Sequence, residues 1–197
     1  MPQPDHIMAL DITPETSTAD DANEKLFQVC EDKLGFVPNV LKAYGARPRK
    51  LQTFSRHYNE LMLGESGLTK LEREMIAVVV SSANHCYYCL VAHGAAVREL
   101  SGDPQLGEML VMNYRVAELS DRQRAMLDFA HKLTATPSQM GEQDREDLRQ
   151  VGFSDADIFD IADVTGFFNM SNRVASAVDM LPNTEYHGAH RDDDATE

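Results

Sequence analysis

Apolar residues recur at spacings of three and four along most of the chain, which is the period of an amphipathic helix. In the segment "DDANEKLFQVCEDKLG", Leu26, Phe27 and Leu34 fall on one helical face. Gly35 follows the last apolar position, where a glycine commonly caps a helix end. The pattern predicts a short helix from about residue 20 to 34.

The same period predicts further helices downstream. They are expected in "NVLKAYGA", in "RPRKLQTFSRHYNELMLG" beyond the separating Pro48, and in "TKLEREMIAVVVSSA", "SDRQRAMLDFAHKLTAT", "DREDLRQVG" and "SDADIFDIADVTGFFNMSNRVASAVDML". Thr69 with Glu72 three residues later matches a capping box, and Ser120 and Ser154 are cap residues of the same kind. The run 75–80 is almost wholly apolar, so its helix should be central and buried on most sides.

Alternating runs bounded by turn residues, the signature of strands, are absent from the sequence. The chain is therefore expected to be all-α. With 197 residues it is long enough for one domain with a full core, which we place at residues 21–185. Residues 1–20 are expected to be an extended arm lying on the surface or on a neighbouring subunit, and residues 186–197 an acidic, solvated tail.

Charge and composition indicate which classes of binding partner and which cellular compartment to expect. A formal net charge of −14 repels phosphate backbones and anionic lipid surfaces, so no nucleic-acid partner is expected. No apolar run is long enough to span a bilayer, and the N-terminus does not resemble a signal peptide, so no membrane association is expected. Three cysteines cannot all pair within one chain, which favours the reducing cytoplasm. In that compartment a close cysteine pair is typical of catalysis or metal binding.

The cysteine pair lies in "NHCYYCLVAHGAAVREL". Asn84 is a favoured N-cap residue, so a helix is expected to begin at His85 with Cys86 in its first turn. The free N–H groups and the positive end of the helix dipole stabilise a thiolate at that position. A lowered thiol pKa would make Cys86 a better nucleophile near neutral pH.

Helical spacing also brings a base to the thiols. Cys86, Cys89 and His93 are separated by three and four residues and therefore share one helical face. His93 is placed to take a proton from Cys89, directly or through one water. Glu74, just before the apolar run, is the candidate carboxylate that would orient the imidazole, because its burial requires a hydrogen-bonded partner.

Two other interpretations of the cysteines are open. A zinc ion would have to be held by His85, Cys86, Cys89 and His93, but four ligands within nine residues of one helix do not easily surround a tetrahedral ion. Alternatively, the two cysteines simply fill core space. The coherent spacing of the histidine and the glutamate favours a redox dithiol over both, so we expect no metal and no cofactor.

The combination of Glu74, the motif Cys86-Tyr87-Tyr88-Cys89 and His93 resembles the AhpD alkylhydroperoxidase group of the carboxymuconolactone decarboxylase-like superfamily, and in particular its peroxidase-related branch. The resemblance extends over roughly residues 30 to 180. It implies an AhpD-like helical fold, a homo-oligomer, and a CxxC pair that reduces a hydroperoxide and is itself reduced by a dithiol protein or a small thiol.

The resemblance also implies roles for individual residues. Cys89 would attack the peroxide, Cys86 would be the resolving cysteine, and His93 with Glu74 would relay protons. The helix dipole alone favours Cys86 as the more acidic thiol. We keep the assignment of the family at this stage, because His93 is one turn from Cys89 and a direct general base outweighs the dipole.

One position departs from the family. Characterised AhpD proteins have a histidine immediately before the second cysteine, where this chain has Tyr88. A tyrosine donates a hydrogen bond but does not act as a base near pH 7. The expected consequence is a simplified relay, a lower rate, or an oxidant other than an alkyl hydroperoxide.

Two alternative functions remain at the level of sequence. The first is a carboxymuconolactone decarboxylase-like acid/base enzyme that uses His93 and Glu74 on a small molecule, although decarboxylase members lack the CxxC pair. The second is a non-catalytic redox sensor. Other polar or reactive residues are expected to be structural or to approach the site from neighbouring helices: Cys30, His57, Tyr58, His131, Asn169 and Arg173.

Overall fold

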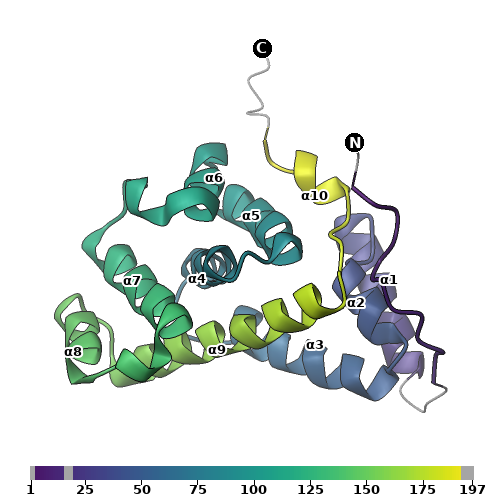
Figure 1. Ribbon diagram of the computed structural model, residues 1–197, viewed down its shortest axis with the longest axis horizontal. Helices are drawn as coiled ribbons and strands as arrows, with labels where there is room; N and C mark the ends of the chain where they lie inside the picture. The colour runs from purple at the N-terminus through teal and green to yellow at the C-terminus, as the bar shows by residue number, and fades with distance from the viewer. Residues whose placement is uncertain (1–2, 16–19, 192–197) are drawn as a thin grey trace.

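The computed structural model describes residues 3–15 and 20–191, and every regular element in these ranges is helical (Figure 1). The elements in chain order are α1 (Asp20–Leu34), α2 (Asn39–Gly45), α3 (Pro48–Leu63), α4 (Lys70–Ala83), α5 (Tyr87–Ser101), α6 (Pro104–Asn113), the 3₁₀ turn η1 (Tyr114–Val116), α7 (Asp121–Ala135), the 3₁₀ turn η2 (Pro137–Gln139), α8 (Glu142–Gln150), α9 (Asp155–Ala177) and α10 (Glu185–Gly188). The all-α prediction is confirmed.

Helix α4 lies at the centre of the domain, seen nearly end-on in Figure 1 between α5, α6, α7 and α9. All residues from 72 to 81 are buried, including the whole apolar run that the sequence singled out. Each fully buried aliphatic side chain contributes about 1.5–3 kcal/mol relative to exposure. The core is therefore built around one helix that has no solvent face over most of its length.

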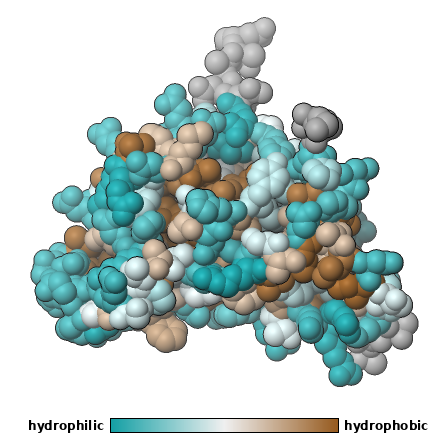
Figure 2. Space-filling model, in the orientation of Figure 1, coloured by the Kyte–Doolittle hydropathy of each residue, from teal (hydrophilic) through white to brown (hydrophobic). Residues whose placement is uncertain are grey.

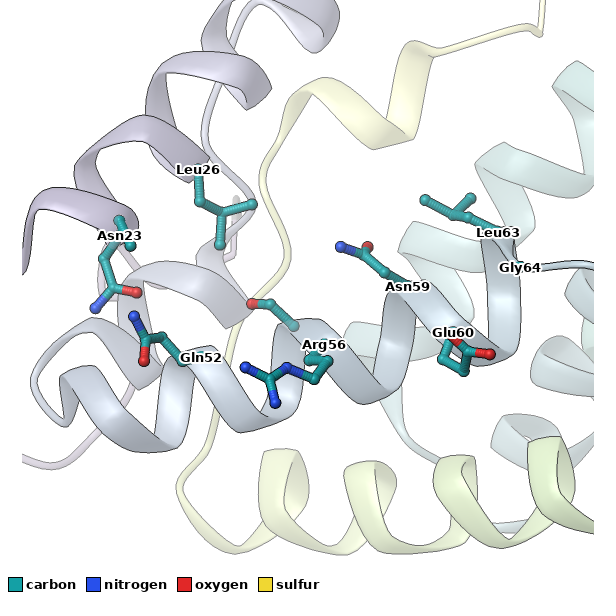
Figure 3. A pocket seen from close by; sticks show the side chains of 10 residues that line it. Asn23, Leu26, Gln52, Arg56, Asn59, Glu60, Leu63 and Gly64 are labelled. Atoms are coloured by element: carbon teal, nitrogen blue, oxygen red, sulfur yellow. The ribbon is translucent and has the colours of Figure 1, made fainter. Parts of the chain in front are cut away.

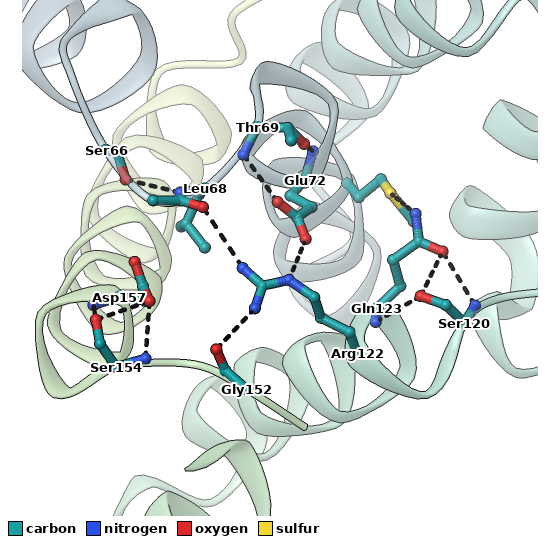
Figure 4. Close-up of polar contacts among 12 residues, drawn as sticks. Ser66, Leu68, Thr69, Glu72, Ser120, Arg122, Gln123, Gly152, Ser154 and Asp157 are labelled. Carbon is teal, nitrogen blue, oxygen red and sulfur yellow. Dashed lines mark hydrogen bonds and ion pairs between the residues drawn. The ribbon is translucent and has the colours of Figure 1, made fainter. Parts of the chain in front are cut away.

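The beginning of α4 is fixed by reciprocal hydrogen bonds (Figure 4). The Thr69 hydroxyl accepts from the Glu72 backbone N–H at 3.1 Å, and the Glu72 carboxylate accepts from the Thr69 N–H at 2.8 Å. The second oxygen of Glu72 accepts from Nε of Arg122 on α7 at 3.0 Å. A buried carboxylate is thus paired with a cation and with a backbone donor, as burial of a charge requires.

The charge of the next residue of α4, Arg73, is balanced by backbone carbonyl groups. Its guanidinium donates to the carbonyl oxygens of Leu61 and Gly64, at 2.9 and 3.0 Å, where α3 ends. These carbonyls have no partner within their own helix, because the last turn of a helix leaves its C=O groups free. Arg73 therefore joins the end of α3 to the start of α4.

The capping box predicted at Thr69 is present, and the predicted caps Ser120 and Ser154 also form capping boxes. Helix α6 was not anticipated. Its start carries an available signal, since the Asp103 side chain accepts from the Gln105 N–H and Pro104 occupies the first helical position. The glycines at the ends of α1 and α8, Gly35 and Gly152, adopt the left-handed conformation expected of caps.

The described part of the N-terminal arm, residues 3–15, contains no helix and lies against the chain's own C-terminal segment. The Ala9 N–H donates to the Val178 carbonyl at 2.8 Å, and the Leu181 N–H donates to the Ile7 carbonyl at 3.0 Å. Residues 1–2 and 16–19 of the expected arm are outside the described residues. The arm thus packs beside the segment that follows α9.

Residues 186–191 were expected to belong to a solvated tail, but in the structure they pack against the domain. The guanidinium of the buried Arg98 on α5 donates to the carbonyls of Tyr186 and Ala189, both at 2.9 Å. Arg191 pairs with Glu108 on α6 at 2.5 Å. These contacts fasten α10 and the residues after it to α5 and α6, whereas residues 192–197 of the tail lie outside the described part.

The surface in Figure 2 is mainly hydrophilic, with smaller hydrophobic areas between the polar residues. The most exposed large apolar side chains are Met112, Phe159 and Val116, with 80%, 68% and 64% of their surface accessible. Single exposed apolar side chains are ordinary on folded proteins. None of the helices in residues 3–15 and 20–191 has the length and apolar character needed to cross a bilayer.

Replacing Thr69 tests how much the α4 cap contributes. Thr69→Ala removes the hydroxyl acceptor and should lower the free energy of unfolding by about 1 kcal/mol, whereas Thr69→Ser keeps the acceptor and should stay near the parent value. Urea denaturation at one fixed protein concentration measures both. Equal stability of the alanine and serine variants would contradict this role.

Candidate active site

The cysteine pair begins at a tight connection between α4 and α5. Asn84 ends α4, the His85 N–H donates to the Ser82 carbonyl at 3.1 Å, and His85 has a left-handed φ of 52°. The Cys86 N–H then donates to the Ser81 carbonyl at 3.0 Å. These two bonds form the Schellman arrangement, in which the left-handed position is usually glycine.

This connection corrects the expected helix start. Helix α5 begins at Tyr87, and Cys86 is its N-cap instead of a first-turn residue. Asn84 caps the end of α4, because the Schellman turn uses residues 84–86 to stop one helix before the next begins. Cys86 still faces the free N–H groups of α5, so the dipole argument applies to it from the cap position.

The two thiols, both buried, interact with each other. The pKa of Cys86 is lowered to about 6, first because the Cys89 thiol donates a hydrogen bond to the Cys86 sulfur. Burial opposes this effect, while the Cys89 backbone N–H, the Ser176 hydroxyl and the charge of His93 add to it. Cys86 is therefore the thiol that ionises first.

The pKa of Cys89 is raised for the complementary reasons: its hydrogen is held by the Cys86 sulfur, the thiol is buried, and the charge on Cys86 repels a second one. The side chains of Asn172 and Ser171, both on α9, hydrogen-bond its sulfur and partly oppose the rise. Two adjacent thiols with pKa values pushed apart are the usual sign of different roles in a reaction.

Glu74 and His93 meet as the sequence suggested. The Nδ1 atom of His93 lies 2.6 Å from Oε2 of Glu74, and the two side chains are only 12% and 10% exposed. The imidazole also packs edge-on against Phe168 on α9, with ring centroids 4.6 Å apart. With Nδ1 engaged by the carboxylate, Nε2 is the ring nitrogen left for proton transfer.

The Tyr88 hydroxyl accepts a hydrogen bond from the Val40 N–H of α2 at 3.0 Å. Burial raises its pKa well above the ordinary tyrosine value, so it stays protonated near neutral pH. Tyr88 therefore joins α5 to the beginning of α2 and does not serve as a base.

Two further tyrosines, Tyr58 and Tyr186, are part of the electrostatic surroundings of the Glu74 carboxylate. Burial raises the pKa of Tyr58, on α3, and the nearby charges of Glu74, Tyr186 and Cys89 raise it further. The pKa of Tyr186, on α10, is also raised, first by burial and then by the charges of Cys30, Glu74 and Glu185.

A small cavity of about 230 Å³ opens at Cys86. It is lined by residues 85–88 from the start of α5, by Ala175 and Ser176 from the last turn of α9, and by residues 179–181 after it. Cys89 is not among the lining residues. Cys86 thus lines this cavity and Cys89 does not, while both residues are almost wholly buried, with 1% and 2% of their surface accessible.

A larger hollow of about 520 Å³ lies between α1 and α3 (Figure 3). Polar side chains such as Asn23 and Arg56 project into it from the two helices, and Leu26 and Leu63 line its sides. No cysteine or histidine lines this hollow. It is separate from the dithiol.

Other residues that the sequence singled out are placed away from the cavity. Asn169 accepts from Asn84 at 3.1 Å and donates to Thr134 at 2.9 Å, so it links α4, α7 and α9. Arg173 donates to Asn169 on the same helix. Both residues therefore form polar contacts around α9, and neither lines the cavity.

The remaining candidates also lie apart from the dithiol chemistry. His131 packs near Tyr114, and burial lowers its pKa. His57 packs edge-on against Phe167. Cys30 is a partly buried free thiol on α1, and burial raises its pKa. In residues 3–15 and 20–191, no three His, Cys, Asp or Glu side chains converge as metal ligands would.

Sequence reasoning missed the contribution of α9 to the thiols. Asn172 is 1% exposed, donates to the Ser81 hydroxyl at 3.0 Å and accepts from Asn84 at 3.0 Å, while also reaching Cys89. Ser176 reaches Cys86 in the same way. The available signal was the polar pair Ser171 and Asn172 within an otherwise apolar helix.

Comparison with known proteins gives consistent results. The model of the carboxymuconolactone decarboxylase family matches residues 48–132. A crystal structure of an uncharacterized peroxidase-related protein from Silicibacter sp. TM1040 is 64% identical, with a TM-score of 0.91, and the match covers 97% of this chain and all of the other.

A second structure, described as an alkylhydroperoxidase AhpD core and uncharacterized peroxidase-related protein from Ralstonia eutropha JMP134, is 42% identical with a TM-score of 0.89. It covers 95% of this chain and 98% of its own. The debrominase Bmp8 shares the fold, with a TM-score of 0.76 at 19% identity over 93% of this chain and 97% of its own. No curated protein matched the chain.

The split between the two thiols predicts their titration. As the pH rises through about 6, Cys86 should lose its proton, and thiolate ultraviolet absorbance should increase by the amount of one thiolate. Cys89 should ionise only at a pH well above that of an ordinary thiol. Cys86→Ser should remove the transition near pH 6. A reduced protein without absorbance change below pH 8 would contradict the arrangement.

Proposed function

Because the chain belongs to the carboxymuconolactone decarboxylase family, in its AhpD-like, peroxidase-related branch, we propose that it reduces hydroperoxides with the Cys86/Cys89 dithiol. The observation that carries the proposal is the hydrogen-bonded pair of thiols with opposite pKa shifts, next to the buried Glu74–His93 pair. A nucleophile, a second thiol and an oriented base are thus collected at the start of one helix.

The proposed cycle uses both thiols. One thiolate attacks the O–O bond, so that an S–O bond forms, the O–O bond breaks, and the alkoxide takes a proton and leaves as alcohol. The second thiol then loses its proton and attacks the sulfenic sulfur, which forms the disulfide and releases water. A dithiol reductant, either a protein or a small thiol, reopens the disulfide and is itself oxidised.

His93 and Glu74 move protons in this cycle. The carboxylate holds Nδ1 at 2.6 Å and fixes the ring, so Nε2 takes a proton from a thiol and returns it to a leaving oxygen. Phe168 limits the tilt of the ring by its edge-on contact. Since Tyr88 is neutral and bonded to α2, His93 is the base of the proposed relay.

The proposed chemistry also indicates the cellular compartment of the protein. A dithiol that cycles through a disulfide needs a compartment in which reductants keep it open, and the cytoplasm is such a compartment. A homo-oligomer, as the family resemblance implies, is part of the same proposal. The acid/base alternative would use Glu74 and His93 without the thiols, but the coupling between Cys86 and Cys89 supports the dithiol cycle.

Substitutions at the proton-transfer pair test the proposed function. His93→Gln and Glu74→Gln should each reduce dithiol-coupled consumption of tert-butyl hydroperoxide by about 10²–10⁴-fold, because general acid–base catalysis is lost. Replacing either cysteine of the pair with serine should abolish turnover. His190→Gln, at an exposed histidine of the C-terminal segment, is the matched control and should retain the parent rate.

Two results would overturn this function. Turnover that survives both cysteine substitutions would favour an acid/base enzyme of the decarboxylase type. Stoichiometric oxidation of the thiols without turnover, under protein or small dithiol reductants, would favour a redox sensor.

A further inference from the structure

We infer that residues 3–9 of the N-terminal arm form a strap over the Cys86/Cys89 dithiol, and that the strap detaches before the dithiol reacts. The inference rests on the proposed function. It concerns how a hydroperoxide and a reductant reach the two sulfurs.

The dithiol is covered in the structure. Cys86 and Cys89 have 1% and 2% of their surface accessible, and Cys86 is this buried although it lines the cavity of about 230 Å³. A hydroperoxide has to bring an oxygen to a sulfur, and a dithiol reductant has to bring a sulfur of its own to the disulfide. The closed arrangement therefore has to open during the proposed cycle.

One part of the cover does not belong to a helix. Both cysteines lie in a buried apolar cluster, and four partly buried side chains pack against it: Met8, Val40, Ala92 and Val178. Val40 and Ala92 lie in α2 and α5, and Val178 is the C-cap of α9. Met8 lies in the strap, which contains no helix. Of the four, Met8 is therefore the side chain that can leave without disturbing a helix.

The strap runs antiparallel to residues 178–182, which we call the wall segment; Figure 1 shows the purple N-terminal trace beside the yellow trace that follows α9. The Ala9 N–H donates to the Val178 carbonyl at 2.8 Å, and the Leu181 N–H donates to the Ile7 carbonyl at 3.0 Å. These two backbone bonds flank Met8 along the strap. They hold its side chain against the cluster that contains the thiols.

Side chains of the strap also bind residues around the cavity. The Gln3 amide donates to the Pro182 carbonyl at 2.8 Å, and its oxygen accepts from the Tyr87 hydroxyl at 3.4 Å. Nε2 of His6 lies 3.0 Å from Oδ2 of Asp179. Tyr87 and Asp179 both line the cavity. The strap is thus fastened to the rim of the space beside the dithiol.

The wall segment has anchors of its own. The Asn39 amide donates to the Leu181 carbonyl at 3.0 Å, and the Asn183 amide donates to the Val37 carbonyl at 3.0 Å. The Asn39 N–H donates to the Asn183 side chain at 2.7 Å. These bonds do not involve the strap. The wall segment therefore stays in place when the strap leaves.

A second attachment of the arm limits how far the release extends. The Glu15 N–H donates to the Ala46 carbonyl at 3.1 Å, and the Glu15 carboxylate pairs with Arg47. This attachment lies six residues beyond the strap, at the connection between α2 and α3. The strap can therefore detach while the chain remains fixed at Glu15.

The contacts of the strap are weak compared with those of the helices around the dithiol. Each backbone bond adds only a small net stabilisation, and the His6 and Asp179 side chains are 34% and 64% exposed, so their pairing adds little. Moving α4, α5 or α9 would break the core. Local opening follows the segment with the fewest buried contacts, which here is the strap.

Two adjacent amides of the parent protein provide the first test. The Leu181 N–H is bonded to the strap, whereas the Met180 N–H is bonded to the Ala175 carbonyl of α9 at 2.9 Å. In amide hydrogen exchange of the reduced full-length protein, Leu181 should be protected about 10-fold less than Met180, because release of the strap breaks only the first bond. Equal protection of the two amides would overturn the inference.

A proline substitution in the strap provides the second test. Ala9→Pro removes the N–H that donates to Val178. Alkylation of Cys86 and Cys89 by iodoacetamide, followed by peptide mapping, should become about fivefold faster, as expected when one hydrogen bond of the closed form is lost. An unchanged alkylation rate at both thiols would refute the covering role of the strap.

Two controls accompany this variant. Leu10→Pro is the matched substitution, because the Leu10 N–H has no hydrogen-bond partner among the described residues, and it should keep the parent rate. Cys30, on α1 beyond the Glu15 attachment, is the internal reference and should be alkylated equally in all three proteins. A parallel rise at all three cysteines in Ala9→Pro would indicate general loosening and would count against the strap.

Reaction with peroxide tests the gating itself. Oxidation of the reduced dithiol by tert-butyl hydroperoxide should accelerate in Ala9→Pro by about the same fivefold factor as alkylation, because both reactions need the open form. Faster alkylation with unchanged peroxide oxidation would mean that peroxide enters by another route, and the gating role would fail.

The same measurements separate this inference from the proposed function. If the parent consumes tert-butyl hydroperoxide with a dithiol and Ala9→Pro changes neither rate, the function stands and the strap fails. If the parent consumes no hydroperoxide while Ala9→Pro exposes both thiols to iodoacetamide, the proposed function and the gating of it fail together, and only the covering of the thiols by the strap is supported.

Discussion

The burial of α4 over residues 72–81 is the constraint on which the rest of the structure depends. A helix without a solvent face has to find partners inside the protein for each charged side chain it carries, and α4 carries three in succession. Glu72 is paired with Arg122, Arg73 with carbonyls at the end of α3, and Glu74 with His93 of α5. The carboxylate–imidazole pair proposed for proton transfer is therefore also part of how the core tolerates its central helix.

The same helix determines where the thiols stand. Because α4 must be followed at once by α5 packed beside it, the chain reverses in a Schellman turn, and Cys86 is the first residue after the turn. The free N–H groups of a new helix begin there, at the boundary between the core and the cavity. A tight connection between two packed helices thus produces a position that is close to the core, rich in donors and open on one side.

Much of this fold could be predicted from the sequence, because caps and periodic apolar faces are local signals. The boxes at Thr69, Ser120 and Ser154 lie within three residues of chain, and Glu74, Cys89 and His93 belong to two helices that are adjacent in sequence. The start of α5 could not be predicted, since Asn84 is acceptable both as an N-cap and as a helix-ending residue, and only packing decides. The contribution of α9 to the surroundings of the thiols could not be predicted for another reason. Its residues reach the thiols across more than eighty positions of sequence, and no local pattern marks that approach.

The residue immediately before Cys89, Tyr88, affects which groups the proposed cycle has for proton transfer. A histidine at that position would add a second base next to Cys89, whereas the neutral Tyr88 is bonded to Val40 and packed in the core. In the proposed cycle His93 is then the base of the relay, and the ionisation of Cys86 is favoured by the helix start and by the neighbouring thiol. In this arrangement the dithiol itself holds one proton between two sulfurs. Their hydrogen bond favours a thiolate on Cys86 and keeps the proton on Cys89, so the two thiols of the proposed cycle begin in different protonation states.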